Sequence, residues 1–235
     1  MKIIYHAAAI FLLMGIVVSK SWADGIPVDK VYHPNILANE RKLEWRLVSR
    51  QNDDGNLLAQ RIAYGQAISD NLIIEGYIVG ERDELGDFGL QAYELEARWM
   101  LSEQGELWAD WGALLEIEKQ HTKNTFELTT GLLFEKEYTH TSLTINALLV
   151  YEWGNSIKNE METEVRLKYR YRYTPAFQPA IEIYTGEDFV GIGPAFMGLH
   201  RYQGQKQLNW EMAFIAGLNG DAKDHTLRFA IEYEF

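Results

Sequence analysis

The strongest pattern in the chain is an alternation of apolar and polar residues with a period of two, which is typical of β-strands whose two faces meet different surroundings. The last stretch shows it without a break, because one face carries only apolar side chains. They are Leu227, Phe229, Ile231, Tyr233 and Phe235. Comparable segments recur from residue 40 onwards. The sequence therefore predicts an all-β fold made of short, alternating strands.

We expect about twelve strands, and an even number would return both ends of a barrel to the same, periplasmic side. The expected segments lie at about residues 40–50, 58–68, 72–81, 90–101, 106–118, 126–134, 143–151, 162–173, 180–186, 192–202, 208–214 and 226–235. Residues 51–56 form a turn-forming cluster. The phase of the third segment is ambiguous because Ile73 and Ile74 are adjacent. Pro194 predicts a bulge or a strand end, because proline cannot donate to a β-ladder.

The polar faces of these segments carry full charges, which a soluble protein core would not accept. An apolar outer face and a polar inner face are the signature of a transmembrane, antiparallel, up-and-down β-barrel. Aromatic residues near the strand ends, such as Tyr171 and Tyr173, are typical of an interfacial girdle. The alternative is a soluble periplasmic barrel or sandwich, which also alternates.

The N-terminus has the pattern of a secretory signal peptide, predicted to end at residue 23. Lys2 is followed by a mostly apolar run over residues 3–18, which is short for a membrane span of about 20 residues. Residues 24–39 contain few apolar alternations, and we predict a periplasmic leader segment there, either loose or tucked into the barrel mouth. Residues 40–235 are predicted to form the barrel.

Charge and composition exclude some functions. The formal net charge is −12, and it becomes −14 when the predicted signal peptide takes away Lys2 and Lys20. Such a chain is unsuited to nucleic acid, which calls for a basic surface. The chain has no cysteine, so disulfides do not stabilise it. A closed barrel would supply stability by pairing every backbone group with a neighbouring strand.

Several short stretches resemble a group of uncharacterised proteobacterial outer-membrane proteins. They are Gln51-Asn52-Asp53-Asp54-Gly55, Ala92-Tyr93-Glu94-Leu95-Glu96, Trp108-Ala109-Asp110-Trp111-Gly112, Tyr151-Glu152-Trp153-Gly154 and Glu232-Tyr233-Glu234-Phe235. The aromatic-rich last strand with its terminal Phe is also similar to the end of Gram-negative outer-membrane β-barrels. This resemblance implies residence in the outer membrane, contact with its lipids, and an assembly signal in Tyr233 and Phe235 that the barrel-assembly machinery reads. It implies no activity.

Candidate functional residues lie on the predicted inner faces. The basic ones are Arg166, Lys168, Arg170 and Arg172, and the others are Glu94, Glu96, Arg98, Asp110, Glu116 and Glu118. We expect the basic row to stand roughly across the ring from the acids, as a constriction that selects polar or anionic small solutes. The alternative is a salt-bridged lattice that fills the lumen, because twelve strands lie between the widths of closed and open barrels.

Enzymatic and metal-binding functions are less favoured. His200 lies in a predicted strand, but no serine lies in that strand or its predicted neighbours, and a catalytic triad needs a nucleophile as well as a base. Glu94 and Glu96 are paired acids on one strand face. Their spacing alone does not distinguish the two carboxylates of a glycosidase from charges that line a lumen. We predict no catalytic residue, no metal site and no cofactor. The sequence favours a small porin-like channel, with a non-conducting structural or envelope-interaction barrel as the alternative and an outer-membrane enzyme as a third possibility.

Overall fold

The computed structural model describes residues 28–52, 55–82, 86–155, 157–186, 189–218 and 224–235. The predicted signal peptide and residues 24–27 of the leader segment lie outside the described residues. No helix in the described ranges is long and apolar enough to cross a membrane.

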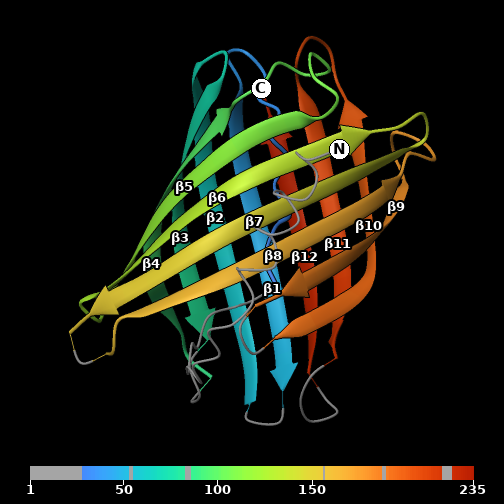
Figure 1. The fold of residues 1–235 in the computed structure, drawn as a ribbon. Coiled ribbons are helices and arrows are strands. Elements are labelled where there is room, and N and C mark those ends of the chain that lie inside the picture. The colour runs from blue at the N-terminus through green and yellow to red at the C-terminus, as the bar shows by residue number, and fades with distance from the viewer. Residues whose placement is uncertain (1–27, 53–54, 83–85, 156, 187–188, 219–223) are drawn as a thin grey trace, which may run out of the picture.

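The described residues form twelve antiparallel strands that close into one barrel (Figure 1). The strands are β1 (Arg41–Asn52), β2 (Gly55–Ser69), β3 (Leu72–Arg82), β4 (Phe88–Met100), β5 (Asp110–Gln120), β6 (Thr125–Glu137), β7 (Thr141–Gly154), β8 (Glu160–Tyr171), β9 (Gln178–Thr185), β10 (Val190–Arg201), β11 (Gln207–Gly217) and β12 (His225–Glu234). Each strand pairs with its neighbours in sequence, and β1 pairs with β12. The predicted fold class is therefore confirmed.

Burial along the strands is inverted relative to a soluble protein. On β4, Leu95 is 54% exposed whereas Glu96 is fully buried at 0%. On β1, Leu43 is exposed and Arg46 is buried. An outward apolar face and an inward charged face are what a transmembrane barrel requires, because lipid contacts the outside and the polar side chains line the lumen.

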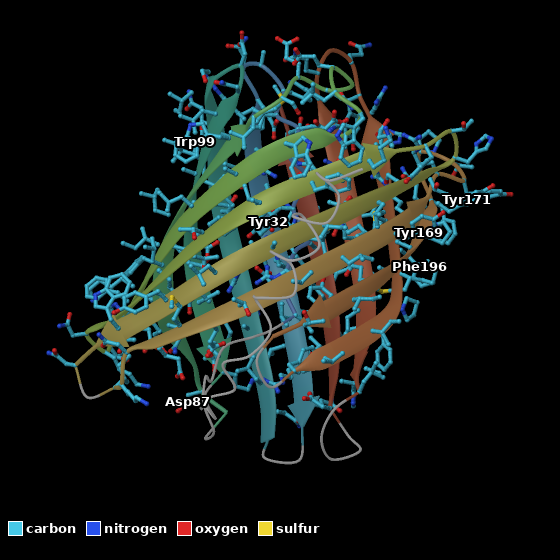
Figure 2. All side chains as sticks on the ribbon, in the orientation of Figure 1. Tyr32, Asp87, Trp99, Tyr169, Tyr171 and Phe196 are labelled. Carbon is cyan, nitrogen blue, oxygen red and sulfur yellow. The ribbon has the colours of Figure 1, made fainter. Side chains whose placement is uncertain are left out.

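Aromatic side chains lie on the outer surface of the barrel. Figure 2 shows Trp99, Tyr169, Tyr171 and Phe196 projecting away from the strands. Tyr171 stacks on Tyr173 just beyond the end of β8, with their ring centroids 6.5 Å apart. Such rings suit the boundary between lipid and water, where an apolar body and a polar tip are both accommodated.

The ambiguous phase of β3 is resolved by packing. Ile73 is fully buried and packs with Ala67 of β2 and with Ile36 of the leader segment. Ile74 therefore points outwards and is partly exposed. The apolar side chain at the inner position is explained by the leader, which offers it an apolar partner inside an otherwise polar lumen.

The predicted strand over residues 106–118 is wrong at its start, because β5 begins at Asp110. Gly105 adopts a left-handed φ of 75°, and its N–H donates to the Asp110 carboxylate at 2.7 Å. Only glycine adopts this backbone conformation at little cost. The bond closes a connection before β5, so the alternation that includes Leu107 and Ala109 continues into a segment that is not a strand.

The chain reverses within residues 51–56 as predicted, but over a shorter stretch, because β1 and β2 are antiparallel and pair as far as Asn52 and Gly55. The prediction at Pro194 is wrong. Pro194 neither ends β10 nor shifts its register, because pairing with β11 resumes in the same register at Ala195. The missing proline N–H interrupts the ladder locally without adding a residue to the strand.

The leader segment, described from Val28 to Asn39, passes through the barrel lumen. Val28 and Val31 pack among inward residues of β9, β10 and β11. Tyr32 packs against inward residues of β5, β6 and β7, and Ile36 packs against β2 and β3. Figure 2 places Tyr32 near the centre of the barrel outline. Contacts to such widely separated walls are possible only for a segment inside the ring.

An arginine on the lipid face should destabilise the barrel. We expect Leu95→Arg to lower the free energy of unfolding by about 2–4 kcal/mol, because the charge would lie at mid-membrane depth. Thr122→Arg, in the exposed connection between β5 and β6, is the control and should have little effect. Unfolding by urea from lipid vesicles measures both. Equal stabilities of the two variants would contradict the assigned strand faces.

Candidate functional site

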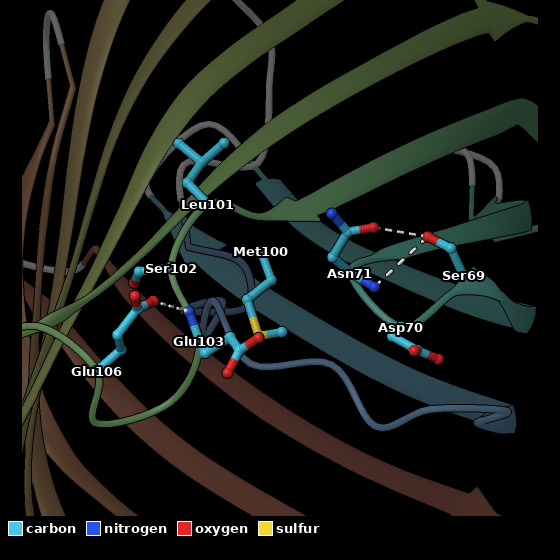
Figure 3. A pocket seen from close by; sticks show the side chains of 8 residues that line it. All are labelled: Ser69, Asp70, Asn71, Met100, Leu101, Ser102, Glu103 and Glu106. Carbon is cyan, nitrogen blue, oxygen red and sulfur yellow. Dashed lines mark hydrogen bonds between the residues drawn. The ribbon is translucent and has the colours of Figure 1, made fainter.

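One surface pocket lies at the end of the barrel where β1 begins, between the β2–β3 turn and the β4–β5 connection (Figure 3). Its lining residues are Ser69, Asp70, Asn71, Met100, Leu101, Ser102, Glu103 and Glu106. The Ser69 hydroxyl donates to the Asn71 side chain at 2.7 Å. The Glu103 N–H donates to the Glu106 carboxylate at 3.4 Å. These hydrogen bonds stabilise the local connections between strands. The charged lumen is therefore the candidate functional site.

The inner strand faces carry a lattice of ion pairs. Arg228 of β12 lies 3.0 Å from Glu182 of β9 and 3.2 Å from Glu211 of β11. Lys168 of β8 approaches the same two carboxylates at 3.5 and 3.2 Å. Arg228 and Glu182 are almost completely buried. Removing one partner from such a pair leaves a buried charge uncompensated, which is strongly unfavourable.

The predicted basic row faces the lumen, and each member has an acidic neighbour. The pairs are Arg166 with Glu164, Lys168 with Glu182 and Glu211, Arg170 with Glu135, and Arg172 with Glu137. The expectation that this row stands across from the predicted acids is wrong, because β8 is three strands from β5 and four from β4 in a ring of twelve. The basic row is instead neutralised by Glu164 of the same strand and by carboxylates of β6, β9 and β11.

The other predicted lumen residues also point inwards. Glu94, Glu96 and Asp110 are buried, and Glu116 and Glu118 are partly buried.

Arg98 is buried and serves two elements at once. Its guanidinium lies 3.0 Å from Glu75 of β3 and donates to the backbone carbonyl of His33 in the leader segment at 3.2 Å. This arginine therefore ties the leader to the wall as well as joining β4 to β3.

A row of glutamates crosses five neighbouring strands, with each glutamate opposite the next in the strand register. The register places Glu94 opposite Glu118, Glu118 opposite Glu127, Glu127 opposite Glu152, and Glu152 opposite Glu160. We call these five residues the acidic row. Like charges directly opposite each other destabilise a sheet, so the row has a cost that the fold does not require. Local alternation predicts their faces, but only the strand register reveals the row.

Asp29 of the leader segment is surrounded by guanidinium groups. Its Oδ2 lies 2.9 Å from Arg61 and 3.6 Å from Arg166, and Arg46 donates to its Oδ1. Burial alone would raise the pKa of the Asp29 carboxyl, but these three cations hold that pKa well below its usual range. Asp29 is therefore an anion held inside the lumen.

Lys30 makes the complementary contacts. Its Nζ donates to Glu44 at 2.7 Å and to Glu232 at 2.9 Å. Burial would lower the pKa of this ammonium group, but the two carboxylates raise it above its ordinary value. Asp29 and Lys30 are adjacent and oppositely charged, and each is bound by wall groups of the complementary charge.

The wall also binds the leader backbone. The Asn146 side chain accepts from the Tyr32 N–H and donates to the Tyr32 carbonyl, both at 2.7 Å. Arg166 donates to the Lys30 carbonyl at 3.2 Å. A buried extended segment needs such partners because its backbone groups have none of their own. The wall therefore satisfies backbone groups of the leader as well as its side-chain charges.

Sequence reasoning did not identify Asp29, Lys30 or the lattice residues Arg46, Glu182 and Arg228 as site residues. The three lattice residues lie on the polar faces of alternating strands, and that signal was available. Asp29 and Lys30 lie in a segment without alternation, and nothing local indicates that it enters the lumen. Their role depends on contacts far apart in the sequence.

The predicted assembly signal lies at the closing seam. Tyr233 and Phe235 stack with their ring centroids 5.7 Å apart, and the Phe235 N–H donates to the Arg41 carbonyl at 2.8 Å. Their reading by an assembly machinery stays a prediction. Within the described ranges, no group of three or more His, Asp or Glu side chains could hold a metal ion.

Comparison with known proteins agrees with this architecture. No protein-family model matches the chain, and no curated protein matches it. Among solved structures, it is similar to the COG4313 outer membrane channel from Pseudomonas putida F1, with 11% identity, 88% of this chain and 100% of that chain covered, and a TM-score of 0.61. It is also similar to the KdgM porin in complex with disordered oligogalacturonate, with 9% identity, 83% and 99% covered, and a TM-score of 0.57.

A third similar structure is the Acinetobacter baumannii outer membrane protein Omp33, with 7% identity, 85% of this chain and 99% of that chain covered, and a TM-score of 0.51. At such identities the likeness concerns the fold. The chain is a β-barrel of the Gram-negative outer-membrane type, and its architecture is that of small porins and channels.

Breaking the lattice should destabilise the barrel. Arg228→Met leaves Glu182 with a weaker set of partners at a fully buried position, and we expect a loss of roughly 3–5 kcal/mol in the free energy of unfolding. Arg201→Met, at an exposed position near the end of β10, is the control and should change little. Unfolding in vesicles compares the two variants. A loss at Arg228 no greater than at Arg201 would show that the lumen pair is not structural.

Proposed function

We propose that the protein is a small porin-like channel for small polar solutes, and that its leader segment occupies the passage in the closed state. The observation that carries this proposal is the binding of a charged, extended segment inside a charged lumen. Asp29 and Lys30 contact wall groups on several strands, so the leader fills the space that a solute would cross. The fold of the similar solved channels supports the same function.

The charge balance of the wall supports a leader that can leave. The arginines around Asp29 each have a second partner on the wall: Arg46 with Glu44, Arg61 with Glu94 at 3.3 Å, and Arg166 with Glu164 at 2.7 Å. Asp29 and Lys30 together carry no net charge. Departure of the leader would therefore leave these wall cations paired, and the barrel would not have to refold around isolated buried charges.

The acidic row favours solutes that carry a positive group. The basic row, which made anionic solutes the expectation from sequence, is paired with neighbouring carboxylates. In the acidic row, by contrast, glutamates face glutamates from β4 to β8. Side-chain rings of this sign attract cations and repel simple anions.

A non-conducting structural barrel is the second candidate. The buried pair of Arg228 and Glu182 favours it, because such pairs fill the lumen with fixed side chains. In either case outer-membrane lipids would contact the apolar face, and the barrel-assembly machinery would read Tyr233 and Phe235. We propose no enzymatic activity, in line with the channels that share the fold.

Weakening the leader contacts should open the channel. In planar bilayers the wild type should stay mostly closed, whereas Asp29→Ala/Lys30→Ala should show long-lived conductance, because both charged anchors are removed. His33→Ala is the matched control within the leader, since its side chain is exposed and its contact with Arg98 uses the backbone carbonyl. A folded double variant that never conducts would favour the structural barrel.

The acidic row should set the ion preference of the open channel. In a potassium chloride gradient, the reversal potential of Asp29→Ala/Lys30→Ala should indicate a preference for potassium. Adding Glu118→Gln and Glu127→Gln should shift it towards chloride, because two carboxylates of the row are neutralised. Glu103→Gln, exposed at the other end of the barrel, should leave it unchanged. An unchanged reversal potential in the row variant would refute this role.

A further inference from the structure

The two charged leader residues occupy two neighbouring seats of opposite sign in the wall. The anion seat consists of Arg46, Arg61 and Arg166, which hold the Asp29 carboxylate. The cation seat consists of Glu44 and Glu232, which hold the Lys30 ammonium group. The lumen therefore contains groups placed to bind one negative and one positive charge side by side.

The seats are joined by a shared side chain. Glu44 accepts from Arg46 Nε through Oε1 at 2.8 Å and from Lys30 Nζ through Oε2 at 2.7 Å. Glu44 and Arg46 are both almost completely buried, so their positions are fixed by packing. The spacing between the two seats is consequently set by one rigid pair of neighbours on β1.

The wall also recognises the peptide groups beside these charges. The Tyr184 hydroxyl donates to the Asp29 carbonyl at 2.6 Å, and Arg166 donates to the Lys30 carbonyl at 3.2 Å. These contacts involve no leader side chain and would be available to any peptide of similar length. Charge and backbone contacts together match the chemistry of a short zwitterionic peptide.

We infer that, once the leader is displaced, the two seats bind small zwitterionic solutes that carry a carboxylate and an ammonium group, with short peptides as the best fit. Asp29 and Lys30 are then internal competitors for this site. The inference rests on the proposed function, because such a solute meets the seats only after the leader has left them.

The seats should bind such solutes weakly. Glu232 keeps Lys42 at 3.3 Å as a second partner, and the arginines of the anion seat keep wall carboxylates. A solute therefore gains only the remaining donors and acceptors of groups that are already paired. Weak binding suits passage, since a solute must be able to leave as well as enter.

The test uses the full chain with Asp29→Ala/Lys30→Ala in planar bilayers. The probe is the dipeptide N-acetyl-Asp-Lys-amide, which carries both side-chain charges and the intervening carbonyl. The matched probes N-acetyl-Asn-Lys-amide and N-acetyl-Asp-Gln-amide each lack one charge. We expect the first probe to block the current, and each matched probe to block roughly tenfold more weakly because one charged hydrogen-bonding partner is lost. Equal block by all three probes would overturn the inference.

Wall variants assign the block to the seats. In the same background, Arg61→Gln should remove the preference for aspartate over asparagine in the probe, and Glu232→Gln should remove the preference for lysine. Arg50→Gln, which alters a partly exposed pair with Asp224 outside the seats, should preserve both preferences. A preference that survives both seat variants would show that the probe binds elsewhere.

Thermal unfolding of the same variants separates this inference from the proposed function. If the double variant does not conduct, the channel is refuted, but stabilisation by the doubly charged probe alone would still support the seats. If it conducts and the probe neither blocks nor stabilises it, the channel stands and the zwitterion site is refuted. Wild-type protein should show neither effect, because its leader fills both seats.

Discussion

The structure depends on one constraint, which is that each arginine or lysine buried inside the barrel must find a carboxylate there. Alternation sends apolar side chains to lipid and sends their neighbours into a narrow lumen between the widths of filled and open barrels. Arg46, Arg98 and Arg228 are almost completely buried there, and each is paired with a carboxylate. The lattice around Glu182 and Glu211 is the consequence, because isolated charges at such positions would be unfavourable.

The path of the leader segment follows from the same constraint. Asp29 and Lys30 enter the lattice as one more ion-paired unit, and Asn146 satisfies the backbone of Tyr32. The wall makes room for this path at Gly112, where a Cβ atom would lie 2.9 Å from the Cβ of Pro34. A glycine in the wall therefore accommodates the leader, in addition to the paired charges.

Sequence reasoning predicted the strands and their faces because alternation is a local property, and Leu95 and Glu96 illustrate how directly a face is read from it. It could not predict which inward charges meet, since that depends on register between strands; Glu127 and Glu152 become neighbours only once β6 and β7 are aligned. It missed the true start of β5 because alternation continued past Gly105. The path of Asp29 through the lumen has no local signal, because its partners lie on β1, β2 and β8.

The distribution of charge argues that the lumen serves more than stability. The cations of β8 are paired with nearby acids, and none of the ion pairs among the described residues brings them to Glu118 or Glu127. A barrel arranged only for stability would place cations opposite such glutamates, since like charges across a sheet are unfavourable. The leader does not cancel the imbalance either, because Lys30 is held by Glu44 and Glu232. Glutamates that face glutamates across five strands, beside a leader whose two charged residues cancel, are therefore the charge distribution on which the proposed passage for positively charged groups rests.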